Sequence, residues 1–322
     1  MSSFGVGRVS SLFVYPMSFD EFLTATGQEG LLRTKRNSSS TNPLPEAFYN
    51  RLVEAFRSYM LVGGMPEVVA TYTETGSYRY SSDIVNEIIQ GYQDDFAKYG
   101  AKANPLLLRQ TLISVAHQAG AKFVYSRVEG QYRSAEVKVA LEMLKDAGLI
   151  IPTYHTDANG VPLGAEINER VVKYLIHDTG VLLGILGIDD DIDDSIKEMM
   201  VADSINLVDK GHVAEMMAGL ELIKYSSPQK RHQLYYWQNM NKGTCAEVDY
   251  VIARSGSIVP IEVKSGVKGS MSSMYSLMRN PQKHIEMGLR CSLENFGTFE
   301  SPDGKKIDII PLYAISNLFA EK

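Results

Sequence analysis

The stretch EVDYVIARSGSIVPIEVKSG, residues 247–266, constrains the fold more than any other part of the chain. Its two runs of valine and isoleucine are typical of β-strands, and Ser255-Gly256 between them predicts the turn of a hairpin. Asp249, Glu262 and Lys264 lie within these apolar runs. Because a charged group inside a sheet costs free energy unless it is paired or binds an ion, these residues indicate a functional site.

Strand alternation places the charged residues on one face of the hairpin. If the turn closes over two residues, Asp249 lies directly across from Glu262, and Glu247 lies across from Lys264. The opposite, core-directed face is expected to hold Val259, Ile261 and Val263. Two facing carboxylates repel each other, so the gap between them requires a cation or a proton.

Carboxylate oxygens favour a hard divalent cation, Mg²⁺ or Mn²⁺, which keeps open positions for water and for phosphate oxygens. Lys264 is expected on the same face, where its ammonium group orients a water nucleophile or stabilises charge on a phosphate. An alternative interpretation also fits the pattern. In it, the charged face points to solvent and Lys264 only pairs with Glu247.

The segment KGHVAEMMAGLELIKY, residues 210–225, predicts a helix. Its packed side is expected to hold Val213, Met216, Met217 and Leu220. Glu215 lies four residues from both Gly211 and Gly219. Each glycine costs about 1 kcal/mol in helix propensity, and together they are expected to leave a groove through which a strand or a ligand approaches the Glu215 carboxylate. A plain exposed glutamate is the alternative.

The composition is that of an ordinary globular chain: 322 residues, 44% hydrophobic and 22% charged, which is long enough for two or three domains. The longest uncharged apolar run, residues 180–188, is about half as long as a bilayer span, so no membrane association is expected. Cys245 and Cys291 form no CxxC and no Cys/His cluster, which disfavours a disulfide framework or a zinc site. A cytoplasmic location fits best.

Charge is distributed unevenly along the chain. The net charge is −6, but residues 222–290 contain ten basic and four acidic residues, a balance of +6, so the remainder carries −12. This basic segment favours a nucleic-acid partner, with Lys242, Arg254 and Lys268 as candidate contacts. Chance clustering on solvated faces is the alternative. The strand expected at HQLYYWQN offers aromatic side chains either for base stacking or, more commonly, for the core.

The rest of the chain is expected to divide into a segment at residues 1–33, a linker at 34–46, a helical domain at 47–200 and a final domain at 201–322. Ser18 is a candidate N-cap, and GGMP at residues 63–66 is expected to break a helix. Residues 104–180 suggest two helices followed by a hairpin, an order that resembles a winged helix. Its charges balance, which favours a structural or protein-contact role over DNA reading.

A helix with Glu215, a strand with Asp249 and a following strand with Glu262 and Lys264 resemble the PD-(D/E)XK endonuclease-like fold. The combination of GHVAE, LYYW, EVDYVI and PIEVKSG resembles the C-terminal domain of bacterial and archaeal AAA-type P-loop ATPases. In that group an ATPase domain is followed by a helical, winged-helix-like region and then by this nuclease-like domain. GVGR and YPMSFDEFL resemble the end of the ATPase domain, and LVGGMPEVV resembles the start of the helical region.

The resemblance implies an α+β multidomain chain, with a helical winged-helix-like region before a nuclease-like α/β domain that has a mixed central sheet. It implies that Asp249, Glu262 and Glu215 bind Mg²⁺ or Mn²⁺ and that Lys264 assists the attacking water. Arg8 is the candidate charge-sensing arginine of the ATPase. Val248 stands where the family motif has proline, a common variation.

The Walker motifs of such ATPases are missing, so we expect no ATP site and either a truncated gene or a fragment.

Three hypotheses follow from the sequence. The first is a Mg²⁺- or Mn²⁺-dependent nuclease acting on DNA or RNA. The second is a non-catalytic module that binds nucleic acid or a partner protein. The third is a remnant whose residues 1–33 expose apolar surface for a protein partner or for self-association.

Overall fold

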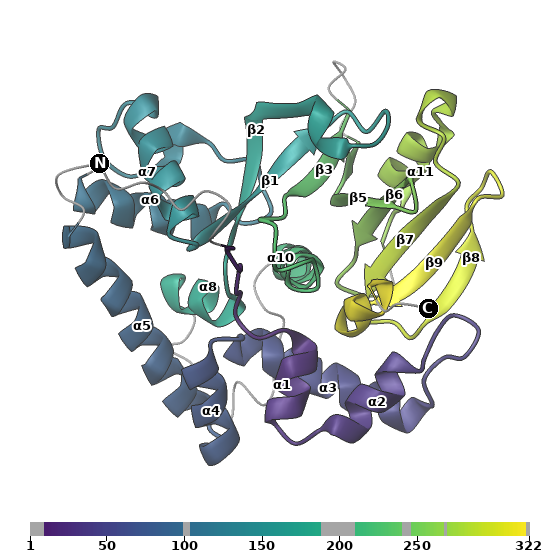
Figure 1. Cartoon of the computed structure of the whole chain (residues 1–322), viewed down its shortest axis with the longest axis horizontal. Coiled ribbons are helices and arrows are strands. Elements are labelled where there is room, and N and C mark those ends of the chain that lie inside the picture. Colours follow the sequence, from purple (N-terminus) through teal and green to yellow (C-terminus); the bar gives the residue numbers. More distant parts are fainter. Residues whose placement is uncertain (1–9, 99–103, 188–209, 240–245, 267–268, 320–322) are drawn as a thin grey trace.

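The computed structural model describes residues 10–98, 104–187, 210–239, 246–266 and 269–319, which form an α+β fold (Figure 1). The helices before the first strand are α1 (Phe19–Ala25), α2 (Glu29–Arg36), α3 (Glu46–Val62), α4 (Pro66–Thr75), α5 (Tyr78–Lys98), α6 (Pro105–His117) and α7 (Ser134–Asp146). The later helices are α8 (Thr179–Ile185), α10 (Lys210–Lys224) and α11 (Ser272–Arg279). Short 3-10 turns are η1 (Tyr125–Arg127), η2 (Leu163–Glu166), η3 (Pro281–Lys283) and η4 (Leu312–Leu318).

Several helix ends follow the local signals in the sequence. Ser18 caps α1 in a reciprocal capping box with Glu21, as expected for an N-cap. The GGMP segment separates α3 from α4, whose first residue is Pro66. Gly148, with φ +78°, follows the end of α7, where the Leu149 amide donates to the Leu144 carbonyl.

The strands of the described residues form two sheets. The strands are β1 (Ile150–Thr156), β2 (Ile167–Ile176), β3 (Leu234–Gln238), β4 (Glu247–Val248), β5 (Tyr250–Arg254), β6 (Ser257–Val263), β7 (Met287–Ser292), β8 (Gly297–Glu300) and β9 (Lys306–Pro311). The first sheet has the order β2-β1-β3-β4, and the second has the order β5-β6-β7-β9-β8. Both are mixed: β1 runs parallel to β3, and β6, β7 and β9 run parallel to one another.

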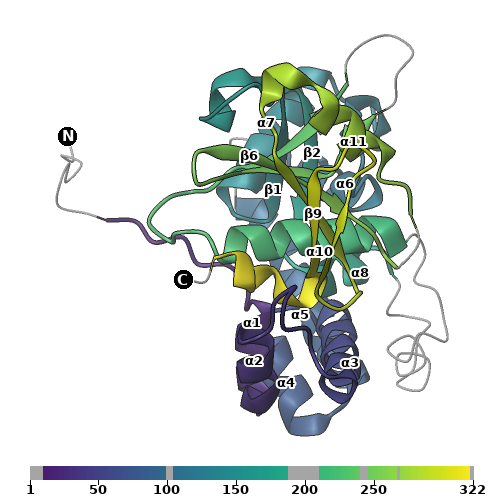
Figure 2. The same ribbon diagram turned by 90° about the vertical axis from the view of Figure 1, so that its right-hand side faces the viewer.

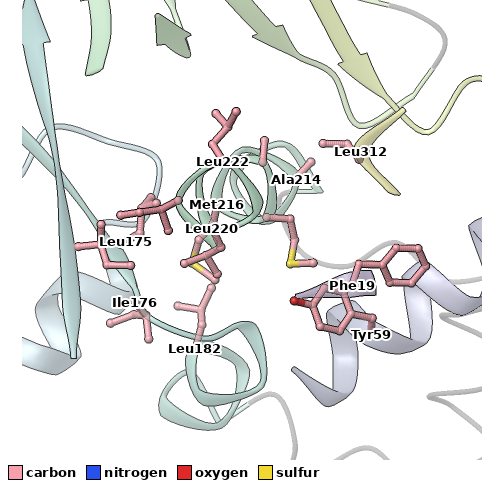
Figure 3. Close-up of a cluster of buried hydrophobic side chains, with 14 of the residues drawn as sticks. Phe19, Tyr59, Leu175, Ile176, Leu182, Ala214, Met216, Leu220, Leu222 and Leu312 are labelled. Atoms are coloured by element: carbon pink, nitrogen blue, oxygen red, sulfur yellow. The ribbon is translucent and has the colours of Figure 1, made fainter. Parts of the chain in front are cut away.

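Helix α10 lies at the centre of the molecule. It contacts β2 of the first sheet, β6 of the second, and also α8 and η4. Figure 2 shows α10 crossing the molecule between the sheets and the layer of helices α1 to α4. Figure 3 shows Leu175, Leu182 and Tyr59 around Met216 and Leu220. The expected packed side, Val213, Met216, Met217 and Leu220, is buried as predicted. Ala214, Leu222 and Ile223 are buried as well, so α10 is enclosed on all sides.

The first sheet crosses the domain boundary that we expected at residue 200, because β3 pairs with β1. The predicted order of two helices and a hairpin is present as α6, α7, β1 and β2, but β3 and β4 extend the hairpin into a four-stranded sheet. The expected linker begins within a helix, since α2 ends at Arg36. The division into domains stays a prediction.

The segment at residues 10–33 is packed against the rest of the chain. Phe19, Phe22 and Leu23 are buried, and the carboxylate of Glu221 accepts a hydrogen bond from the Phe19 amide at 3.2 Å. The large apolar residues that this described segment exposes are Leu12 and Val14. Most of the large apolar side chains of residues 10–33 are therefore packed within the chain itself.

None of the helices in the described ranges is long and apolar enough to cross a bilayer.

Candidate functional site

The hairpin at residues 250–263 has the predicted register. Tyr250 pairs with Ile261 and Arg254 with Ser257, which closes the turn over two residues. Ser255 and Gly256 have φ of +50° and +79°. A type I′ hairpin turn requires positive φ at both of its central residues. Val259, Ile261 and Val263 are buried in the core around α10, as expected. The other face is covered too, because Ile258 packs in a second core with Met274 and Leu277 of α11.

Asp249 lies at the point where one strand passes from the first sheet to the second. The two residues before it form β4, which pairs with β3, and the residues after it form β5, which pairs with β6. Its Oδ2 accepts a hydrogen bond of 2.7 Å from the amide of Val263. The carboxylate oxygen therefore takes the place of the backbone carbonyl that would accept this hydrogen bond in a regular sheet. The hydrogen bond holds Asp249 beside the end of β6. Burial raises the pKa of Asp249 despite this hydrogen bond.

Glu262 is buried on β6 with one oxygen paired and one unpaired. Its Oε1 accepts from the ammonium of Lys264 at 2.6 Å, while its Oε2 has no hydrogen-bond partner in the described structure. Burial and the nearby Asp249 raise the pKa of Glu262 from 4.5 to about 7. The Lys264 side chain packs over Gly269, where an added Cβ would lie 2.6 Å from Lys264 Cδ. Glu262 is thus not directed to solvent, since it is 5% exposed.

Glu215 faces the same region from α10. Its backbone carbonyl accepts a hydrogen bond from the hydroxyl of Tyr250 at 2.8 Å. This approach of β5 to the helix requires Gly219, because an added Cβ there would lie 2.4 Å from the Tyr250 hydroxyl. The groove predicted from Gly219 is present and is filled by a strand. Nothing lies within 4 Å of the corresponding position at Gly211.

Lys173 on β2 joins this site, although its role was not predicted from the sequence. Its Nζ lies 2.8 Å from Glu215 Oε1 and 2.6 Å from Glu247 Oε1. It also lies 5.0 Å from the centre of the Tyr236 ring. The expected pairing of Glu247 with Lys264 is wrong: Glu247 belongs to β4 in the other sheet and pairs with Lys173.

A signal for Lys173 was available, because the run VVKYLI places a lysine within an apolar strand. Burial lowers the pKa of Lys173, but the carboxylates of Glu215 and Glu247 outweigh burial and raise it above its ordinary value. The ammonium group is therefore held in its charged form.

The electrostatics of the site follow from its four carboxyl groups and two ammonium groups. Full ionisation of Glu215, Glu247, Asp249 and Glu262 would leave two negative charges uncompensated by the two lysines. Burial and Asp249 raise the pKa of Glu215 to about 8, although Lys173 acts in the opposite direction. Added positive charge would favour the ionised forms of Glu215, Asp249 and Glu262, whose pKa values are raised.

The donor set fits a magnesium- or manganese-type ion held by two carboxylates. Glu262 Oε2 is a buried oxygen with no hydrogen-bond partner in the described structure, and Asp249 lies near enough to raise the pKa of Glu262. Mg²⁺ commonly uses one or two carboxylates and completes its shell with water and phosphate oxygens. No group of three or more metal-capable side chains occurs in the part of the chain that the structure describes. The third predicted ligand, Glu215, forms an ion pair with Lys173.

The predicted nucleic-acid contacts are only partly described. Lys242 and Lys268 lie outside the described residues, as do Arg8 and Cys245. Arg254, at the end of β5, lines a cavity of about 490 Å³ with Tyr235 and Phe319. The described lining of this cavity includes none of the four predicted catalytic residues. Tyr236 and Trp237 are buried, so the core use of this strand is confirmed for them.

Two domain models match the chain, and both describe domains of unknown function. Residues 53–192 match DUF8612, and residues 210–315 match DUF4143. No curated protein and no solved structure matches the chain. The second match contains the four predicted catalytic residues, whereas Lys173 lies in the first.

Proposed function

We propose that the chain is a metal-dependent nuclease-like protein that binds nucleic acid and hydrolyses its phosphodiester bonds with Mg²⁺ or Mn²⁺. The observation that carries this proposal is the buried Oε2 of Glu262, which has no hydrogen-bond partner in the described structure, in a hairpin whose register places Asp249 across from Glu262. Lys264 lies 2.6 Å from the other oxygen of Glu262. These are the residues on which the resemblance to the PD-(D/E)XK fold rests.

Each side chain has a role that follows from its position. A bound divalent cation would supply positive charge to the phosphodiester and to the attacking water. Asp249 and Glu262 would hold the cation, each with one oxygen already positioned by a hydrogen bond. The Lys264 ammonium would offset the negative charge that develops on the phosphate. Glu215 would support Asp249 through the contact of α10 with β5.

The resemblance of two N-terminal segments to the end of an AAA-type ATPase domain leads us to place this activity beside an ATPase, in the cytoplasm. The chain has no GxxxxGK[ST] motif of its own, so the ATPase would be a separate polypeptide or a segment outside this sequence. The basic segment at residues 222–290 would supply the phosphate contacts.

The test is cleavage of labelled single- and double-stranded DNA and RNA by the purified chain with Mg²⁺ or Mn²⁺. We expect cleavage that is lost with chelator and in Asp249→Asn and Glu262→Gln. Lys264→Met is expected to lower the rate about 100-fold, as removal of a charge-stabilising donor does. Glu300→Gln, at an exposed position on β8, is the control and should cleave normally. Equal cleavage by wild type and Asp249→Asn would contradict the proposal.

A second candidate is a non-catalytic module that binds nucleic acid. One observation favours it: Lys173 occupies the carboxylates of Glu215 and Glu247, which leaves two carboxylates for a metal. This candidate predicts salt-sensitive binding without turnover in the same assays. Binding of a labelled strand that weakens steeply between low and physiological salt, with no cleavage, would favour it.

A further inference from the structure

Lys173 is the most completely enclosed charge in the site. Its side chain is 1% exposed, and its ammonium lies between carboxylate oxygens of α10 and β4 at 2.8 and 2.6 Å. The face of Tyr236 borders the same ammonium at 5.0 Å. Among the described residues, Lys173 is the cation that contacts both carboxylates.

In the absence of Lys173, the position of its ammonium group would suit a metal ion. Two carboxylates brought together at one point require a cation between them, and the Lys173 ammonium lies 2.8 Å from one and 2.6 Å from the other. Glu215 and Glu247 would offer a divalent cation the oxygen ligands that Mg²⁺ and Mn²⁺ prefer. Lysine meets the same requirement with one charge and without dissociating.

We propose that the ammonium of Lys173 takes the place of a second divalent cation, so that the centre binds one metal ion where its carboxylates could bind two. This inference rests on the proposed metal-binding function at Asp249 and Glu262. It also makes the centre a composite, because the lysine comes from the DUF8612 match and the carboxylates come from the DUF4143 match. Lys173 is a positioning residue, since it acts through Glu215 and Glu247.

The experiment counts Mn²⁺ ions bound per chain, from the electron paramagnetic resonance signal of free Mn²⁺ at equilibrium. We expect one ion in the wild type and two in Lys173→Met, whose side chain has a similar length and no charge. Lys173→Arg keeps the positive charge and should bind one ion. The double variant Lys173→Met/Glu215→Gln lacks a ligand of the second ion and should return to one.

Folding of the variant provides a second readout. Without metal, Lys173→Met leaves the carboxyl groups of Glu215 and Glu247 without the cation that they contact, so its melting temperature should fall below that of the wild type. Mn²⁺ should then raise the melting temperature of Lys173→Met more than that of the wild type. If the variant is unfolded without metal, circular dichroism during a Mn²⁺ titration should show it refold as two ions bind per chain.

The outcomes separate this inference from the proposed function. One ion in both the wild type and Lys173→Met would overturn the inference and leave the nuclease proposal intact. No ion in the wild type and one in Lys173→Met would contradict the proposed metal binding at Asp249 and Glu262 and overturn the inference with it, leaving only the exclusion of a cation from Glu215 and Glu247 by Lys173. Two ions in the wild type would overturn the inference, and no ion in either protein would overturn both.

Discussion

Among single residues, Glu262 is one whose burial makes the stability of the folded chain depend on pH. In the metal-free protein, burial and Asp249 raise its pKa from 4.5 to about 7. The folded state therefore holds a proton that the unfolded state releases near pH 4.5. The contribution of Glu262 to the free energy of unfolding is therefore fully present below pH 4.5 and is lost as the pH rises through about 7.

The corresponding prediction compares the wild type with Glu262→Gln, which stays neutral at every pH. Between pH 5 and pH 8 the free energy of unfolding of the wild type should fall relative to that of the variant by about 3 kcal/mol. Urea denaturation of the metal-free proteins measures this difference. Glu300→Gln should follow the wild type. A constant difference between wild type and Glu262→Gln across this range would show that Glu262 is ionised throughout.

The sequence predicted some of these residues and not others for a physical reason. The facing of Asp249 and Glu262 followed from local information, because a two-residue turn at Ser255-Gly256 determines the register. Lys173 meets Glu215, which is 42 residues further along the chain, only through the folding of β2 against α10. No local pattern specifies that encounter. Glu247 was assigned the wrong partner because the bend at Asp249 moves β4 into the other sheet.

Among the elements, α10 combines a structural role with a proposed functional one. It packs against both sheets and presents Glu215 to the site. The sequence predicted the helix and one packed side, since the apolar spacing is local. Its enclosure on every side depends on η4 and α8, which come from distant parts of the chain. The contact with β5 is close because Gly219 has no side chain.

A matched pair of substitutions tests this contact. Gly219→Ala should destabilise the protein by about 1–3 kcal/mol, because the added methyl group meets the Tyr250 hydroxyl in a packed core. Gly211→Ala meets nothing and should be neutral or stabilise by up to about 1 kcal/mol, as helix propensity predicts. Urea denaturation gives both values. The cost of Gly219→Ala should decrease in a Tyr250→Phe background, and equal costs in both backgrounds would argue against this contact.

At the scale of the whole molecule, buried polar groups join the first helices to the last. Lys35 on α2 pairs with Asp20 on α1, and its Nζ lies 2.6 Å from the hydroxyl of Ser316 in η4. The hydroxyl of Tyr59 donates to Glu221 of α10 at 2.9 Å. These contacts connect regions that the sequence divides into separate segments. Linker composition predicts the segments but holds no information on the packing between them.

We propose that Asp249 and Glu262 hold a divalent cation within this composite centre. Manganese anomalous scattering from a crystal soaked in Mn²⁺ tests it most directly. We predict a single strong peak between the carboxylates of Asp249 and Glu262, and no peak at the position of the Lys173 ammonium. A soaked crystal with ordered Asp249 and Glu262 side chains and no manganese peak between them would contradict the claim.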